Sequence, residues 1–136
     1  MKFLPIVVIC LLLSNLALAQ FSIERTRNLG SGFRIETRAE PRSSSFESVG
    51  HFEYLFYGER KLCQVGQYSV DPSGKFAIYQ DAASGILFLF RRADQRVFRL
   101  TPKPVGFPGT FLWYERGGTV EVRFEGNKTF TAFKLP

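Results

Sequence analysis

Polar and apolar residues alternate along most of the chain beyond residue 20, in short runs rich in aromatic and β-branched side chains. Gly, Pro, Asp or Ser bounds each run, which is typical of β-strands joined by turns. No stretch beyond residue 20 places apolar residues at helical spacing, so we expect little or no helix there. The alternation predicts ten strands, at residues 21–27, 32–38, 51–57, 60–66, 75–80, 86–91, 96–101, 110–115, 119–124 and 128–135.

The predicted fold class is therefore all-β. Short turns between consecutive runs favour an antiparallel up-and-down meander of about eight to ten strands, which forms a sandwich or a small barrel. The polar segment 41–45 resembles a flexible loop, but it is too short to separate two domains. Residues 20–136 have the length of one domain, so we expect them to form a single all-β domain.

The first 19 residues have the features of a secretory signal peptide. Lys2 provides a positive charge, an apolar run follows, and Ala17-Leu18-Ala19 matches the small-x-small cleavage pattern. The run is about ten residues long, whereas a membrane-spanning helix needs about 20. We therefore expect residues 1–19 to be cleaved before Gln20. The mature protein is then exported, periplasmic or extracellular, and has no transmembrane segment.

An internal repeat is present in the second half of the chain. Each unit is predicted to be a blade-like meander of three strands, and two such units follow one another. The aligned segments are 74–79 with 109–114 and 97–100 with 132–135 at an offset of 35, and 86–90 with 120–124 at an offset of 34.

One turn in the first unit resembles a turn of a known family. Asp71-Pro72-Ser73-Gly74-Lys75, together with Tyr79, is similar to the turn that opens a blade in TolB-type β-propellers. The resemblance implies propeller-like blades, but a closed propeller has about four to eight of them. We therefore expect the units to pack as a sandwich or to roll into a barrel, unless the protein oligomerises into a ring.

Turn residues predict which side chains share a face. With Gly117 and Gly118 as a two-residue turn, Trp113 pairs with Val122 on an apolar face. We therefore interpret Trp113 as part of the core rather than as a stacking platform for a ligand. The predicted core face consists of Phe111, Trp113, Val120, Val122 and Phe124, and the solvated face of Leu112, Tyr114, Arg116, Glu121 and Arg123.

The same reasoning separates the single His from the single Cys of the mature chain. With Gly58 and Glu59 as a two-residue turn, Cys63 lies opposite Tyr54 and on the other face from His51. A catalytic Cys–His pair needs hydrogen-bond contact, which this register prevents unless a bulge shifts it. We expect Cys63 to be a buried small hydrophobe. An intermolecular disulfide and a reactive thiol are the alternatives.

The hairpin of residues 86–101 is less regular. We expect residues 93–95 to form a three-residue loop, which places five apolar residues on a core face. The reverse face is also apolar, and it needs a cover that is either a second sheet or a binding partner. The core face then holds Ile86, Phe88, Phe90, Phe98 and Leu100, and the reverse face holds Leu87, Leu89 and Val97 beside Arg91 and Arg99.

Positive charge is concentrated in this hairpin and the segment after it. The chain has 18 Lys and Arg residues against 12 Asp and Glu residues, and loss of Lys2 with the signal peptide lowers the net charge from +6 to +5. Residues 91–104 hold five cations and one acid, a net charge of +4. Such a patch attracts anionic partners, or it protects an edge strand from aggregation. The cations are Arg91, Arg92, Arg96, Arg99 and Lys103.

Catalytic chemistry has little support in the sequence. A zinc site needs three or four ligands, and the mature chain has one His and one Cys. Gly30-Ser31-Gly32 lacks the third glycine of a dinucleotide fingerprint, so we predict a hairpin turn there and no cofactor or metal. Asn127-Lys128-Thr129 fits a glycosylation acceptor.

We therefore favour an exported, non-catalytic binding or accessory protein, for example an inhibitor. Its partner is an acidic envelope protein or another anionic envelope component, and nucleic acid is the partner least supported. The binding surface consists of the five cations above together with Leu87, Leu89 and Val97. A small β-barrel carrier of an apolar ligand is the alternative, and a hydrolase that uses His51 is a more distant one.

Overall fold

A computed structural model describes residues 22–41, 49–106, 108–126 and 129–135. These residues form ten strands and no helix, so the predicted all-β antiparallel meander is confirmed. Within these ranges, no helix has the length and apolar character needed to cross a membrane. The strands are β1 (Ser22–Gly30), β2 (Phe33–Pro41), β3 (Val49–Tyr57), β4 (Arg60–Val70), β5 (Phe76–Asp81), β6 (Leu87–Arg91), β7 (Arg96–Arg99), β8 (Phe111–Arg116), β9 (Thr119–Gly126) and β10 (Thr129–Leu135).

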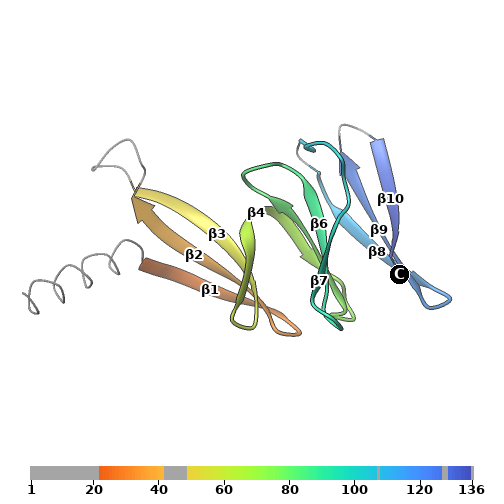
Figure 1. Ribbon diagram of the computed structural model, residues 1–136, viewed down its shortest axis with the longest axis horizontal. Helices are drawn as coiled ribbons and strands as arrows, with labels where there is room; N and C mark the ends of the chain where they lie inside the picture. The colour runs from red at the N-terminus through yellow and green to blue at the C-terminus, as the bar shows by residue number, and fades with distance from the viewer. Residues whose placement is uncertain (1–21, 42–48, 107, 127–128, 136) are drawn as a thin grey trace, which may run out of the picture.

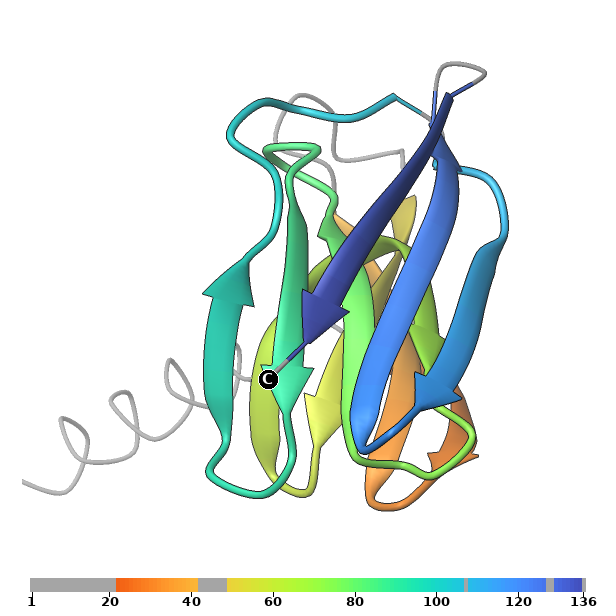
Figure 2. The same cartoon turned by 90° about the vertical axis from the view of Figure 1, so that its right-hand side faces the viewer.

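The strands lie in three stacked layers (Figures 1 and 2). Strands β1 to β7 form one continuous seven-stranded sheet in chain order, and β8 to β10 form a separate three-stranded sheet. The long sheet folds back on itself, so that β1–β3 and the start of β4 form the first layer, and the end of β4 with β5–β7 forms the second. The third layer, β8–β10, covers the opposite face of the second.

A bend in β4 separates the first two layers. The start of β4 pairs with β3, whereas its pairing with β5 begins at Val65. The register then shifts between Val65 and Tyr68, which is a β-bulge at Gly66, and bulges let one strand pass from one sheet to another. Gly66 also leaves room for Gln80, whose Oε1 would lie 2.9 Å from any added Cβ. The predicted fourth strand ends at residue 66, whereas β4 continues to Val70. The bulge interrupts the alternation of side chains at this point, and the sequence pattern therefore suggests an end to the strand.

Two hydrophobic cores fill the spaces between the layers. The second layer is buried on both faces, which explains why β5 and β6 are apolar almost without interruption. The first core, between the first and second layers, is formed by Phe33, Ile35, Leu55, Val65, Ala77, Tyr79 and Phe90. The second core, between the second and third layers, is formed by Phe76, Ile78, Leu89, Val120, Val122 and Leu135.

The hairpin of β8 and β9 has the register that its two glycines predict. Trp113 pairs with Val122 and Arg116 with Thr119. Trp113 packs against the second core, and its indole Nε1 donates a hydrogen bond to Ser69 Oγ on β4 at 2.9 Å. The interpretation of Trp113 as a core residue is therefore confirmed.

The predicted registers of two other hairpins are wrong by one residue. A bulge at Leu62 places Cys63 opposite Leu55 rather than Tyr54, and so on the same face as His51. In the hairpin of β6 and β7, residues 92–95 form a four-residue loop, because Arg91 pairs with Arg96. Phe98 therefore shares a face with Leu89, and Val97 shares a face with Phe88 and Phe90.

Several predictions lie outside the described residues. These are the signal peptide of residues 1–19, the cleavage site before Gln20, the polar segment beyond Pro41 and the glycosylation acceptor at Asn127. The repeat stays a prediction of the sequence. Its two aligned units coincide with β5–β7 and β8–β10, which lie in different sheets.

Candidate functional site

The five predicted cations do not form one patch. Arg91 makes a bidentate ion pair with Asp94, with N–O distances of 2.9 and 2.6 Å, and this contact holds the pKa of the Asp94 carboxyl down at about 2. Arg99 donates to the carbonyl oxygens of Thr101 and Pro102, both at 3.0 Å. The guanidinium of Arg99 therefore stabilises the segment after β7 and is not directed at a partner.

The apolar part of the predicted surface is also corrected. Leu87 and Leu89 are 0% and 1% exposed, because the third layer covers their face of β6. Of the two covers that the sequence left open, a second sheet of the same chain is the one present, so Leu87 and Leu89 are removed from the predicted binding surface. Val97 is 41% exposed and lies on the other face of the hairpin, toward the first layer.

Four turns meet at one end of the molecule, at the bottom of Figure 1. The β3–β4 turn contacts the β1–β2 turn through a hydrogen bond from Gly58 N to Gly32 O at 3.0 Å. The β4–β5 turn contacts Ser31, whose hydroxyl occupies the space that a side chain at Gly74 would need. Arg60, at the start of β4, donates to Gln95 O in the β6–β7 loop at 2.7 Å. Segments far apart in the sequence are thus held together at this end.

Cations gather at this end, where the turns also hold the acids Glu59, Asp71 and Asp94. Lys75 and Arg92 lie opposite each other at the ends of β5 and β6, with Arg92 N bonded to Lys75 O at 2.9 Å. Arg96 lies over the Phe98 ring at 5.3 Å from its centre. Among the described residues, none of these three side chains has a carboxylate partner, and Arg60 bonds only to a carbonyl. We call Arg60, Lys75, Arg92 and Arg96 the basic end.

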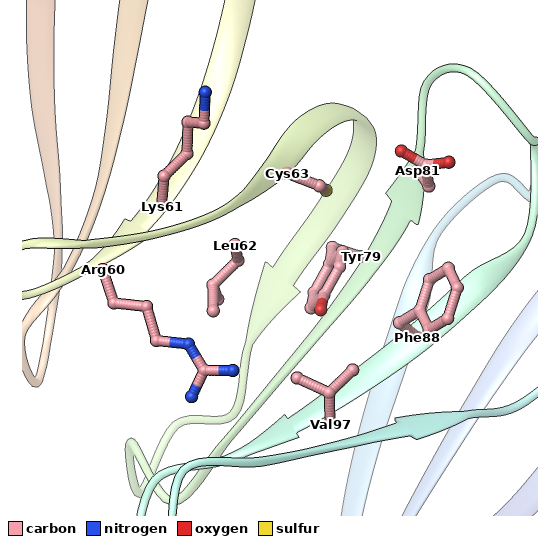
Figure 3. A pocket seen from close by; sticks show the side chains of 8 residues that line it. All are labelled: Arg60, Lys61, Leu62, Cys63, Tyr79, Asp81, Phe88 and Val97. Carbon is pink, nitrogen blue, oxygen red and sulfur yellow. The ribbon is translucent and has the colours of Figure 1, made fainter.

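A groove opens beside the basic end, between β4 and β7. Its volume is about 280 Å³. Figure 3 shows the side chains of Leu62, Phe88 and Val97 facing one another across it, while the ammonium group of Lys61 points away. The guanidinium of Arg60 closes one end. We refer to this space as the groove, and its lining residues are Arg60, Lys61, Leu62, Cys63, Tyr79, Asp81, Phe88 and Val97.

The groove is bordered by strand edges. β7 is the last strand of the seven-stranded sheet, and among the described strands it pairs only with β6. The start of β4 pairs with β3, and its pairing with β5 begins only at Val65. The two edges face each other across the groove, and the contact of Arg60 with Gln95 joins them at the basic end.

The thiol in the groove is not an activated nucleophile. Burial raises the pKa of Cys63 to about 12, and the nearby Asp81 carboxylate adds to the shift. A reactive thiol needs a lowered pKa, since the thiolate is the nucleophile. Burial likewise raises the pKa of Tyr79. Cys63 is half-buried and packs against the first core, so it is a small hydrophobe there but not the fully buried one that the sequence predicted.

His51 is remote from this thiol. Its Nδ1 lies 2.8 Å from a Glu24 carboxylate oxygen, and its side chain is 61% exposed. His51 and Leu55, which is opposite Cys63, are four residues apart on β3, or about 13 Å at the rise of a strand. The bulge at Leu62 therefore puts the two residues on one face without bringing them into contact.

The outer face of the first layer is rich in charges but is internally paired. Glu36 is buried between Arg34 and Arg38, with N–O distances of 3.3 and 2.9 Å. These guanidinium groups also cover the Phe56 ring, at 4.5 and 5.3 Å from its centre. This arrangement shields the Phe56 ring from water and pairs the buried Glu36 carboxylate with two guanidinium groups. These contacts account for the charged residues of this face without a ligand.

Sequence reasoning found part of this site. It identified Arg92, Arg96 and Val97, but not Arg60, Lys75 or the groove. Arg60 and Val97 come together only when the first layer folds over the second, and no local pattern encodes that contact. Within the described ranges, no three His, Cys, Asp or Glu residues are grouped as a metal site requires. Searches of family models, curated proteins and solved structures gave no match to this chain.

Proposed function

We propose that this protein is an exported, non-catalytic binding protein that captures an acidic partner protein through its basic end. The observation that carries the proposal is the convergence of Arg60, Lys75, Arg92 and Arg96 from separate segments without carboxylate partners among the described residues. The backbone of these turns is held by contacts between them, and the Arg60 guanidinium is bonded to Gln95 O, so less conformational freedom is lost on binding than in a mobile segment. They also raise the association rate of an anionic partner at low salt.

The neighbouring chemistry supports binding rather than catalysis. The Cys63 thiol has a raised pKa, and His51 is paired with Glu24 at a distance from it. The groove, at about 280 Å³, is at the lower limit of the roughly 300–1,000 Å³ of small-molecule pockets. Filled cores on both sides of the second layer give no support to a carrier of an apolar ligand.

The proposal can be tested by charge reversal. We expect the double variant R92E/R96E to lose at least tenfold in affinity for a fluorescent poly-L-glutamate of 20 residues at 50 mM NaCl, with little change in Tm. Each reversal removes an attraction and adds a repulsion at a fixed position. Fluorescence anisotropy measures the affinity, and thermal unfolding measures the Tm.

The matched control is R116E/K134E, which changes the net charge equally on the third layer, where both side chains are exposed. We expect it to lose less than threefold in affinity. Equal losses in the two variants would show that only net charge matters and would contradict the proposal. Binding of phosphatidylglycerol vesicles but not of polyglutamate, with the same dependence on Arg92 and Arg96, would assign the basic end to a membrane surface instead.

A further inference from the structure

We infer that the acidic partner binds as an extended segment that adds a strand to the free edge of β7, with alternate side chains in the groove. This inference rests on the proposed function and specifies the form of the partner: a segment in which acidic and apolar residues alternate. Three observations lead to it, namely the unpaired edge, the shape of the groove and the distribution of charge around both.

The backbone of β7 is available for pairing. Leu100 N donates to Leu87 O at 2.9 Å, so Leu100 belongs to a hydrogen-bonded pair of the β6–β7 ladder. In an antiparallel ladder such pairs alternate with pairs that are not hydrogen-bonded. Phe98 and Arg96 therefore direct their N–H and C=O groups toward β6, whereas Val97 and Arg99 direct theirs toward the free edge. An added strand finds two donors and two acceptors there.

The groove accepts apolar side chains next to that edge. Val97 lies on the groove side of β7, and Leu62 and Phe88 complete an apolar surface (Figure 3). In a strand paired with β7, every second side chain points toward this surface. A volume of about 280 Å³ is enough for a few aliphatic side chains. The groove therefore binds apolar side chains at alternate positions of the segment.

The charges select acidic residues at the intervening positions. Arg96 lies on the opposite face of β7 from Val97, so a carboxylate at an intervening position of the added strand lies beside it. Arg60 lies at the basic end of the groove, whereas Asp81, held by Ser84 N and Oγ at 3.0 and 2.6 Å, lies toward the other end. The acidic residues at the intervening positions are therefore expected near Arg96, whereas Arg60 lies in the groove, on the side of the apolar positions, and adds positive charge at the end away from Asp81.

The same charges oppose a second copy of this chain as the occupant. If two β7 edges paired antiparallel, Val97 of one copy would lie opposite Val97 or Arg99 of the other, which makes arginines of the two copies diagonal neighbours on one face. Diagonal neighbours are within reach of long side chains, so these like charges repel, and charged residues on a short edge strand prevent self-association. An acidic strand reverses the sign of this interaction, so the edge of β7 disfavours a second copy and favours an acidic segment.

The test uses two labelled peptides of equal charge and the intact protein. One is Glu-Val-Glu-Val-Glu-Val-Glu, acetylated and amidated, and the other replaces every Val by Pro, which has no N–H and cannot pair on both sides. We expect the Val peptide to bind at least tenfold more tightly in fluorescence anisotropy. Equal binding of the two peptides that still depends on Arg92 and Arg96 would overturn strand addition and leave the proposed function intact. Failure of both peptides to bind would overturn both.

A variant pair tests the same edge from the protein side. V97P removes one N–H from the free edge without cutting the ladder to β6, and V97T keeps that N–H while removing apolar character. We expect V97P to lose at least tenfold in affinity for the Val peptide and V97T less than threefold. Similar losses in the two variants would contradict backbone pairing. If V97P fails to fold, the comparison of the two peptides on the wild-type protein still decides. A concentration-dependent dimer in sedimentation, lost in V97P, would assign the edge to a second copy and would overturn the inference.

Discussion

The first and second cores share the same central layer but differ at their borders. The first core lies beside the groove, where Arg60, Cys63 and Asp81 stand at its margin between two strand edges. The second core is closed by a side-chain contact between layers, from Trp113 to Ser69. The connections explain this difference. One strand, β4, passes directly from the first layer to the second, whereas a loop leads from β7 to β8. Gln80 Nε2 donates hydrogen bonds to two carbonyl oxygens of this loop, Val105 O at 2.8 Å and Gly106 O at 3.0 Å.

This difference separates a region that stabilises the protein from one that can bind. Because a loop rather than a strand joins β7 to β8, the third layer packs against the face of the second layer and buries its apolar side chains. Where a continuous strand must cross, the edges of β4 and β7 remain apart. The space left between them has both backbone groups and charges at its border, which are the elements that an extended ligand needs.

The largest effects are expected from neighbouring residues of β6 that face opposite cores. Phe90 is 0% exposed toward the first core and Leu89 is 1% exposed toward the second. We expect F90A to lower the free energy of unfolding by about 3–5 kcal/mol and L89A by about 2–5 kcal/mol, since each leaves a cavity. Urea unfolding measures both. Because Arg60 lies over the Phe90 ring, only F90A should also weaken peptide binding. A loss below about 1 kcal/mol in either variant would contradict the packing of its core.

A smaller loss is expected from the contact that joins the first two layers at the basic end. Gly74 has a φ of +74° and faces the Ser31 hydroxyl, so G74A adds both strain and overlap, and we expect a loss of about 2 kcal/mol or more. The second variant S31G removes the overlapping group at a residue with a φ of +55°. It should recover part of the loss in the double variant. Strictly additive effects would show that the two turns do not touch.

One side-chain hydrogen bond reinforces the apolar packing that closes the second core. We expect W113F to cost about 1 kcal/mol beyond the loss of apolar area, because it leaves Ser69 without this donor. In a double-mutant cycle with S69A, the coupling free energy should be about 1 kcal/mol. A coupling near zero would mean that the third layer is held by apolar contacts alone. Neither substitution should change binding at the groove.

The smallest effect is expected from the ion pair in the β6–β7 loop. The contact with Arg91 lowers the pKa of Asp94 from 3.8 to about 2. A carboxylate with a lowered pKa stabilises the folded state above its unfolded pKa, and this contribution is lost as the pH falls through the folded pKa. The Tm of D94N should therefore lie slightly below that of the wild type at pH 6, and the difference should shrink as the pH falls from about 4 through the folded pKa of about 2. A difference at pH 2 as large as that at pH 6 would contradict the assignment to this ion pair.

The sequence predicts the strands well and their partners across layers poorly. All ten strands follow from alternation, and the register of β8 with β9 follows from Gly117 and Gly118. The other two hairpins deviate for reasons that composition does not reveal. Leu62 forms a bulge, and Gln95 adopts a φ of +55° that is uncommon for a side chain other than Gly. Each adds one residue and reverses a face.

The candidate site was predicted only where it is local. Arg92 and Arg96 stand out because they lie in one charged hairpin, and Val97 because it breaks the pattern of apolar and polar faces. Arg60 joins them only through the stacking of layers. The same stacking buries Leu87 and Leu89, so that a partner cannot reach them. Alternation shows that a face must be covered, but it does not show by what.

The exchange of backbone amide hydrogens distinguishes the two regions in one experiment. In the free protein, the amides of Val97 and Arg99 should exchange rapidly, since they point to an open edge, while the amide of Val122 in the central strand β9 should be protected. Addition of the alternating Glu-Val peptide should slow exchange at Val97 and Arg99 at least tenfold and leave Val122 unchanged. Unchanged exchange at Val97 and Arg99 when the peptide is bound, or new protection confined to β8–β10, would contradict the binding of an acidic strand at the edge of β7.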